Sequence, residues 1–94
     1  MNGVVNLPAP KVTPEYIKSR ISHWEYHTFA GRLTLCIIHM KNGALITGES
    51  ACVDIRNFDK DIGERIAYDN AFDKLWMLEG YALMERLALG SNSF

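Results

Sequence analysis

The pair Asn42-Gly43 lies between two apolar runs and constrains the fold more than any other feature of the chain. Asn-Gly in such a position is the strongest short-range signal of a β-hairpin, because both central residues of a type I′ turn need positive φ. The preceding run, Leu33 to Met40, is apolar at almost every position, which predicts a central strand covered on both faces. A partner strand is expected to start near Ala44.

A two-residue turn at Asn42-Gly43 also sets the register of this hairpin, because the loop length fixes which residues pair. The expected register pairs Met40 with Leu45 and His39 with Ile46. The predicted sheet then carries Leu35, Ile37, His39 and Ile46 on one face and Cys36, Ile38, Met40, Leu45, Thr47 and Glu49 on the other.

The segment before the hairpin predicts a short helix and one more strand. Thr13-Pro14-Glu15 combines a hydroxyl N-cap, a proline at the first helical position and an acid in the first turn. A helix is therefore expected from Pro14 to about Ser22. Trp24 to Phe29 alternates in the manner of a strand, and Ala30-Gly31-Arg32 separates this strand from the next.

The segment after the hairpin predicts a long helical stretch. Ser50 to Phe58 lacks periodicity and is expected to form a crossing loop, with Asn57 or Asp59 capping the helix after it. No proline occurs from there to Leu89, and Gly90 is a typical helix stop. The stretch holds either one helix of about 30 residues, which would be about 45 Å long, or two helices broken near Gly80.

Together these elements predict a single α+β domain. It has a short N-terminal helix, a three-stranded antiparallel sheet and the long C-terminal helix. Residues 13–90 are assigned to it, because a chain of 94 residues is too short for two independent cores. Residues 1–12, which include Pro8 and Pro10, are expected to be an extended lead-in, and residues 91–94 a tail.

Composition and charge argue against several classes of protein. The formal net charge is −1 and the basic residues are scattered singly, whereas a protein that grips phosphates usually has a positive face. The N-terminus lacks the apolar run of a signal peptide, and no segment approaches a membrane span. Nucleic acid and membrane are therefore not expected as partners, and Cys36 and Cys52 are expected to be cytoplasmic thiols.

The C-terminal helical stretch is apolar on more than one side, which predicts self-association. A single thin sheet cannot cover side chains that spread around much of a helix. The expected homo-oligomer interface comprises Trp76, Met77, Gly80, Tyr81, Met84 and Leu87.

The sequence also resembles a known family. The motifs that carry the resemblance are Ile46-Thr47-Gly48-Glu49-Ser50-Ala51-Cys52, Asn57-Phe58-Asp59, Lys74-Leu75-Trp76, Leu78-Glu79-Gly80-Tyr81 and Glu85-Arg86-Leu87. From about Val12 to Leu87 the chain is similar to the small tailed-phage proteins of the gene-product forty-nine and sixty-six family. The resemblance implies a phage or prophage accessory protein acting in the host cytoplasm, and it implies no activity, cofactor or catalytic residue.

Two constellations suggest chemistry, but neither is expected to form a site. His23 and His27 are four residues apart and suggest shared metal ligation, yet no nearby Cys, Asp or Glu completes a recognised pattern, so no metal or cofactor is expected. His39, Glu49 and Ser50 suggest a nucleophile with its base, but the expected register places His39 and Glu49 on opposite faces. We therefore expect no catalytic residues.

Two sets of residues remain as candidates for binding a ligand or partner. Thr47, Glu49 and Ser50 flank Gly48 in a polar string that could hold an anion, although it is not a P-loop and equally fits a bulge or turn with close packing. Trp76 and Tyr81 are candidate stacking platforms or partner anchors, with a place in the core as the alternative.

The expected function is non-enzymatic binding, because the chain offers aromatic and apolar contact surface and no catalytic constellation. The target is expected to be a host defence factor that is inhibited, or a small signalling ligand that is sequestered. The alternatives are a structural or regulatory oligomer without a ligand, and a small nucleic-acid-associated protein.

Overall fold

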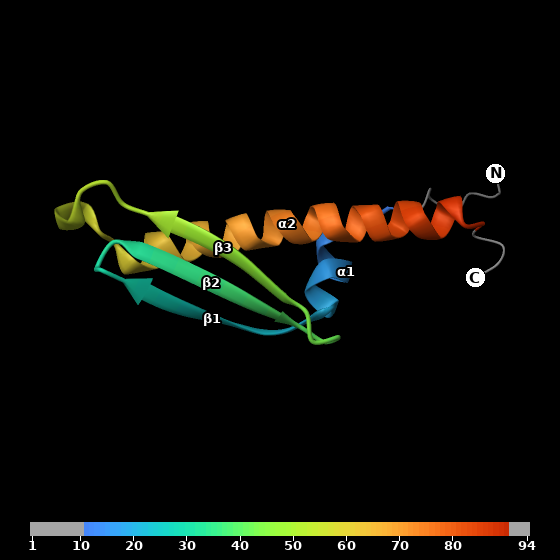
Figure 1. Cartoon of the computed structure of the whole chain (residues 1–94), viewed down its shortest axis with the longest axis horizontal. Coiled ribbons are helices and arrows are strands. Elements are labelled where there is room, and N and C mark those ends of the chain that lie inside the picture. Colours follow the sequence, from blue (N-terminus) through green and yellow to red (C-terminus); the bar gives the residue numbers. More distant parts are fainter. Residues whose placement is uncertain (1–10, 91–94) are drawn as a thin grey trace.

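The computed structural model describes residues 11–90 and contains a three-stranded sheet with helices on one side (Figure 1). This confirms the predicted α+β class and the order of its elements. Residues 1–10 of the expected lead-in and the expected tail at 91–94 lie outside the described residues. The elements are α1 (Pro14–Ser19), β1 (Ile21–Phe29), β2 (Leu33–Met40), β3 (Leu45–Ala51), the 3-10 helix η1 (Ile55–Asn57) and α2 (Lys60–Ala88).

Both α-helices begin at side-chain caps that the sequence indicated. The Thr13 hydroxyl accepts a hydrogen bond from the Tyr16 amide at 3.1 Å, with Pro14 at the first helical position. The Asp59 carboxylate accepts from the first amides of α2, so Asp59 is the cap rather than Asn57. Helix α1 ends at Ser19, earlier than expected, because Ile21 already belongs to β1.

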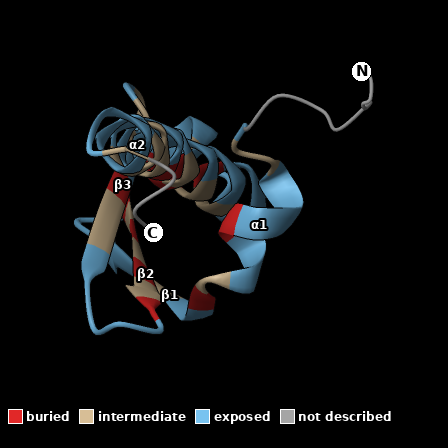
Figure 2. Ribbon diagram, turned by 90° about the vertical axis from the view of Figure 1, so that its right-hand side faces the viewer, coloured by how far each residue is buried: buried red, intermediate tan, exposed pale blue. Residues whose placement is uncertain are grey.

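The sheet has the order β1-β2-β3, with both neighbouring pairs antiparallel, and α2 lies across one of its faces (Figures 1 and 2). Along β2, fully buried residues alternate with half-buried ones. The expectation of a strand covered on both faces is therefore wrong. The apolar run reflects a buried face toward α2 and an open face with apolar side chains of its own.

The loop of the β2-β3 hairpin is one residue longer than predicted. The Met40 amide donates to the Ala44 carbonyl and the Gly43 amide donates to the Met40 carbonyl, each at 2.9 Å, which makes a three-residue loop. Gly43 has a φ of 92°, whereas Asn42 is not in the positive-φ region. Asn42 instead accepts a hydrogen bond from the Ala44 amide on its side-chain oxygen at 3.0 Å.

The longer loop shifts the register and corrects the predicted faces. His39 pairs with Leu45 and Leu35 pairs with Glu49, so Ile46 and Gly48 lie on the α2 side. The open face instead carries Leu35, Ile37, His39, Leu45, Thr47 and Glu49. Because side chains alternate along a strand, one extra loop residue moves the whole of β3 to the other face.

Strand β1 contains a register irregularity between Ile21 and His23. Ile21 pairs with Met40, but His23 pairs with His39, so one extra residue, Ser22, is inserted in β1. A β-bulge of this kind reverses the alternation after it. Trp24 consequently pairs with Ile38 on the α2 side of the sheet, and His23 shares the open face with His39.

Small residues of α2 allow it to approach the sheet closely at Gly48. A Cβ added at Gly48 would lie 2.3 Å from the Ala67 carbonyl oxygen and 2.3 Å from the Ala71 nitrogen. Gly63, Ala67, Ala71 and Leu75 are the buried positions of α2, spaced four residues apart. The buried apolar core comprises Ile17, Ile21, Cys36, Ile38, Met40, Ala67, Ala71 and Leu75.

Helix α2 is one continuous helix from Lys60 to Ala88, so the alternative of two helices broken near Gly80 is wrong. Its C-terminal part extends beyond the sheet (Figure 1). The molecule measures 57 × 26 × 19 Å and its radius of gyration is 17.6 Å. A compact domain of this length would have a radius of gyration of roughly 12 Å. The sheet therefore supports only part of the helix.

Candidate functional site

The C-terminal half of α2, residues 76–88, is called the helix arm here because none of its residues is fully buried. The exposed fractions are 75% for Met77, 68% for Tyr81 and 70% for Met84. These three residues succeed one another at spacings of four and three, so they form a stripe along one side of the helix. Leu87 continues this stripe at 42% exposure.

Gly80 lies beside this stripe, and no atom of residues 11–90 lies within 4 Å of a Cβ added there. Its lack of a side chain therefore serves no close approach within the described residues. Trp76 and Tyr81 are five residues apart, which places them roughly 140° apart around the helix. The structure consequently separates these two candidate binding residues onto different sides of α2.

An aromatic row leads from the sheet to the start of the helix arm. Trp24 of β1 contacts Tyr68 of α2, with ring centroids 5.1 Å apart. The Tyr68 and Phe72 centroids are 5.9 Å apart, and those of Phe72 and Trp76 are 6.3 Å apart. These separations and the tilted ring planes are those of favourable aromatic pairs. Trp76 therefore packs against the core through Phe72 but also remains partly exposed, so it combines the two roles that the sequence suggested, a core residue and a partner anchor.

Two grooves flank Trp24 between β1 and α2. The larger one, about 460 Å³, is lined by Lys18, Ile21, Ser22, Trp24 and Tyr68. The second groove, about 270 Å³, shares Trp24 and Tyr68 with the first and is otherwise lined by Tyr26, Asp61, Glu64 and Arg65. Burial raises the pKa of Tyr68 and of Tyr26, so both phenols are neutral near physiological pH and can donate a hydrogen bond.

The polar string around Gly48 does not form one site. Thr47 and Glu49 lie on the open face, whereas Gly48 is buried against α2. The Asn70 side-chain amide donates to the Glu49 carbonyl at 2.8 Å, which ties α2 to β3. The close-packing interpretation of this motif is therefore supported by the geometry.

The structure also keeps the suggested triad residues apart. His39 and Glu49 lie on the same sheet face, contrary to expectation, but Glu49 pairs with Leu35, four residues along β2 from His39. At about 3.3 Å per residue this is roughly 13 Å. Ser50 follows Glu49 on β3, so its side chain lies on the other face of the sheet, where it lines a cavity on the α2 side.

That cavity has a volume of about 160 Å³ and lies near the start of α2. Among residues 11–90, the buried Thr34 hydroxyl beside it has no hydrogen-bond partner. The Asp59 carboxylate, however, accepts from the Asp61 and Ile62 amides at 3.0 and 3.1 Å. The helix start therefore already holds a negative charge, which disfavours the binding of an anion there.

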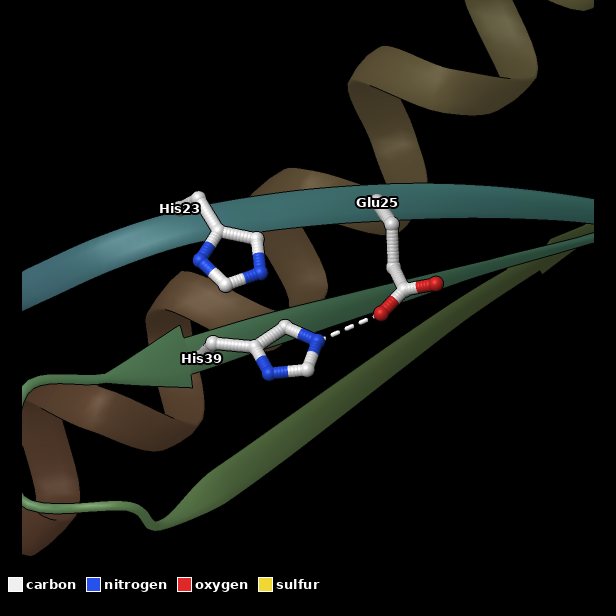
Figure 3. A group of neighbouring side chains, drawn as sticks. All are labelled: His23, Glu25 and His39. Atoms are coloured by element: carbon white, nitrogen blue, oxygen red, sulfur yellow. Dashed lines mark hydrogen bonds and ion pairs between the residues drawn. The ribbon is translucent and has the colours of Figure 1, made fainter.

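All three histidines of the chain gather on the open face around Glu25. Figure 3 shows two of them, His23 and His39, beside Glu25. The His39 ring stacks on that of His23, with centroids 4.1 Å apart and planes 13° apart. His39 and His27 both donate through Nε2 to Glu25, His27 at 2.7 Å. These two hydrogen bonds hold the pKa of Glu25 below its ordinary value.

Sequence reasoning missed the residues that complete this cluster. Glu25 lies between His23 and His27, and alternation along a strand places all three on one face. Sequence reasoning did not consider Glu25, which the structure groups with His23 and His39 rather than with the pair His23 and His27. The contribution of His39 depends on the pairing of β1 with β2, which no local pattern indicates.

These features define a small two-layer α+β protein whose helix layer extends past the sheet it covers. Residues 12–87 match the family described as "Phage protein (N4 Gp49/phage Sf6 gene 66)". The chain therefore belongs to this phage protein family, which confirms the resemblance. No curated protein and no solved structure matches this chain. Within residues 11–90, no helix has both the length and the apolarity needed to cross a membrane.

Proposed function

We propose that this phage protein acts by non-enzymatic binding in the host cytoplasm, as a homo-oligomer that inhibits a host defence factor. The helix arm joins copies of the chain, and the assembled arms present the surface that binds the host protein. This proposal rests on the family, which supplies the phage setting, and on the exposure of the arm.

The single observation that carries the proposal is the apolar stripe formed by Met77, Tyr81, Met84 and Leu87. Soluble monomers seldom expose contiguous apolar surface of this kind without a partner. Methionine and tyrosine suit a binding surface, since methionine adapts its shape and tyrosine combines an apolar ring with a hydrogen-bonding hydroxyl. The stripe runs along one side of a rigid helix, a form in which helices commonly dock into grooves or onto other helices.

A second candidate function is sequestration of a small signalling ligand, and the groove beside Trp24 favours it. Its volume of about 460 Å³ falls within the range of roughly 300–1,000 Å³ that is usual for small-molecule sites. Trp24 and Tyr68 offer ring faces for stacking, and Lys18 offers a positive charge for an anionic group.

Native mass spectrometry of the protein purified from infected host cells separates these functions. A double variant, Met77→Glu with Met84→Glu, places two charges in the stripe and should abolish both oligomer and host partner. Val53→Glu is the matched control, since Val53 is an exposed apolar residue outside the arm. A retained small molecule that survives the double variant and is lost in Trp24→Ala would support sequestration instead.

Inhibition of a host factor also requires a biological readout. Phage growth on a host that carries the targeted defence should fall with the double variant and stay unchanged with Val53→Glu. Wild-type protein that remains monomeric and retains neither protein nor ligand would contradict both functions.

A further inference from the structure

We propose that His23, Glu25 and His39 form a binding site for a divalent transition-metal ion of the zinc type. The site lies on the open face of the sheet, away from α2 (Figure 3). It is separate from the helix arm and does not depend on the proposed function.

The side chains offer the correct donors in the correct place. One ligand atom from each of His23, Glu25 and His39 lies within 4.8 Å of the others. Two imidazoles and a carboxylate are a ligand set that suits Zn²⁺ and its neighbours in the first transition row. Zn²⁺ with bonds of about 2.0–2.2 Å places its ligands roughly 3.3–3.6 Å apart. His23 is exposed and Glu25 half-buried, so their side chains have room to close this difference.

The backbone positions the ligands through the irregularity in β1. In a regular strand Ser22 would pair with His39, and His23 and Glu25 would share the parity of Ile21 and point toward α2. The bulge turns them to the open face and brings His23 directly opposite His39. Bulges are common next to functional sites because they redirect side chains in this manner.

Neighbouring residues orient two of the three ligands. The Ser22 hydroxyl lies 3.1 Å from Nδ1 of His23, which leaves Nε2 of that ring for a metal ion. His27 donates to Oε1 of Glu25 at 2.7 Å and so fixes the carboxylate while its other oxygen faces His39. Such outer contacts to metal ligands are a regular part of metal sites.

The hydrogen bond between His39 and Glu25 is compatible with this role. On metal binding His39 would ligate the ion through Nε2 and carry its one proton on Nδ1, with any second ring proton released to solvent, and the Glu25 carboxylate would become its neighbour on the metal. With three protein ligands on an exposed sheet face, a water molecule would complete the coordination of a four-coordinate ion.

Isothermal titration of the full-length, tag-free protein with Zn²⁺ near neutral pH tests the proposal. We expect one ion per chain with micromolar or tighter affinity, and no binding of Mg²⁺, which prefers oxygen ligands. His23→Gln, Glu25→Gln and His39→Gln should each weaken Zn²⁺ binding by about tenfold to a hundredfold, and His27→Gln by less. Glu49→Gln, on the same face, should leave the affinity unchanged.

Two further measurements separate binding at this site from binding by a thiol and from loss of folding. Cys52 has a partly exposed thiol, and thiols are also good zinc ligands. If the ion binds at His23, Glu25 and His39, Cys52→Ser should retain full binding. At the same concentration, Zn²⁺ should raise the melting temperature of the wild type more than that of His23→Gln, and circular dichroism without metal verifies that each variant folds. Equal Zn²⁺ affinities for wild type, His23→Gln and Glu25→Gln would overturn the proposal, as would the absence of binding.

Discussion

Gly48 is the residue on which the packing of the sheet against α2 depends most directly. The backbone of Ala67 and Ala71 occupies the space where its side chain would be. Cys36, by contrast, fills the core between the same layers and is fully buried. Burial raises the pKa of its thiol to about 11, because the apolar surroundings disfavour the thiolate. Both residues serve packing rather than chemistry.

Gly48→Ala should destabilise the protein by about 3 kcal/mol, because backbone atoms cannot move aside as a flexible side chain would. Gly43→Ala is the matched control: nothing lies within 4 Å of its added Cβ, so only the positive φ should cost stability, about 1 kcal/mol. Urea unfolding of both variants measures the difference. Equal losses would show that α2 does not approach β3 as closely as the structure has it.

The two cysteines should differ in reactivity toward a thiol reagent. Cys52 is partly exposed, whereas Cys36 is buried with a pKa of about 11, and only the thiolate is nucleophilic. We expect one thiol per native chain to react rapidly and the second only after unfolding. Cys52→Ser should remove the rapid phase, and two rapid thiols in the native protein would contradict the burial of Cys36.

The β2-β3 hairpin shows how one element can be identified correctly and still be placed in the wrong register. The predicted pairing would have turned Glu49 toward α2, where a carboxylate without a partner is costly. The observed three-residue loop directs Ile46 and Gly48 to α2 and Glu49 to the open face. Packing against the helix therefore accounts for the register, and Asn42 contributes through its side chain rather than through positive φ.

Substitutions in this loop distinguish the two turn types. Gly43→Val should cost about 2 kcal/mol, since a β-branched residue is strained at positive φ. Asn42→Ala should cost only about 1 kcal/mol, the typical value of one hydrogen bond. Thermal unfolding of both variants provides the comparison. A larger loss for Asn42→Ala than for Gly43→Val would indicate that Asn42 has the special backbone conformation.

The molecule as a whole is elongated because α2 is longer than the sheet it covers. The last buried residue of the helix is Leu75, and the arm beyond it carries only exposed and half-buried residues. The apolar stripe of the arm and Gly80 beside it form the side available to another copy. This geometry supports assembly through the arm, which remains a prediction.

Gly80→Leu should weaken assembly more than Met84→Leu, which roughly conserves volume. In the described part of the same chain, nothing lies within 4 Å of a Cβ at position 80, and leucine is a better helix former than glycine by almost 1 kcal/mol. Any loss of assembly therefore arises at the contact with another copy. Analytical ultracentrifugation at micromolar concentration measures the outcome, and a monomeric wild type would exclude an arm-mediated oligomer.

Affinity for DNA should be weak and should disappear at physiological salt, because scattered basic residues offer few simultaneous phosphate contacts. Fluorescence anisotropy with a labelled duplex at low and physiological salt tests this expectation. Tight and sequence-selective binding at physiological salt would instead favour the nucleic-acid-associated alternative.

The sequence by itself determined the elements of this protein and their order, because the signals for them act over a few residues. Thr13 and Asp59 cap helices through contacts two or three residues away. Alternation identifies β1, and a continuous apolar run identifies β2. Strand alternation would equally have placed His23, Glu25 and His27 together. These elements, and the grouping of these three residues on one face, could be predicted because they depend only on residues close together in the sequence.

Only the tertiary structure decided the register of β3, the joining of His39 to the cluster and the extent of the exposed arm. Each of these depends on contacts between distant parts of the chain. The Gly48 contact with Ala67 and Ala71 accounts for the register, and the bulge at Ser22 with the β1-β2 pairing brings His23 to His39. The apolar spread of the helix indicated that the sheet would leave some of it uncovered. Where the arm begins, however, depends on where the sheet ends (Figure 1), and that is a relation between lengths in space.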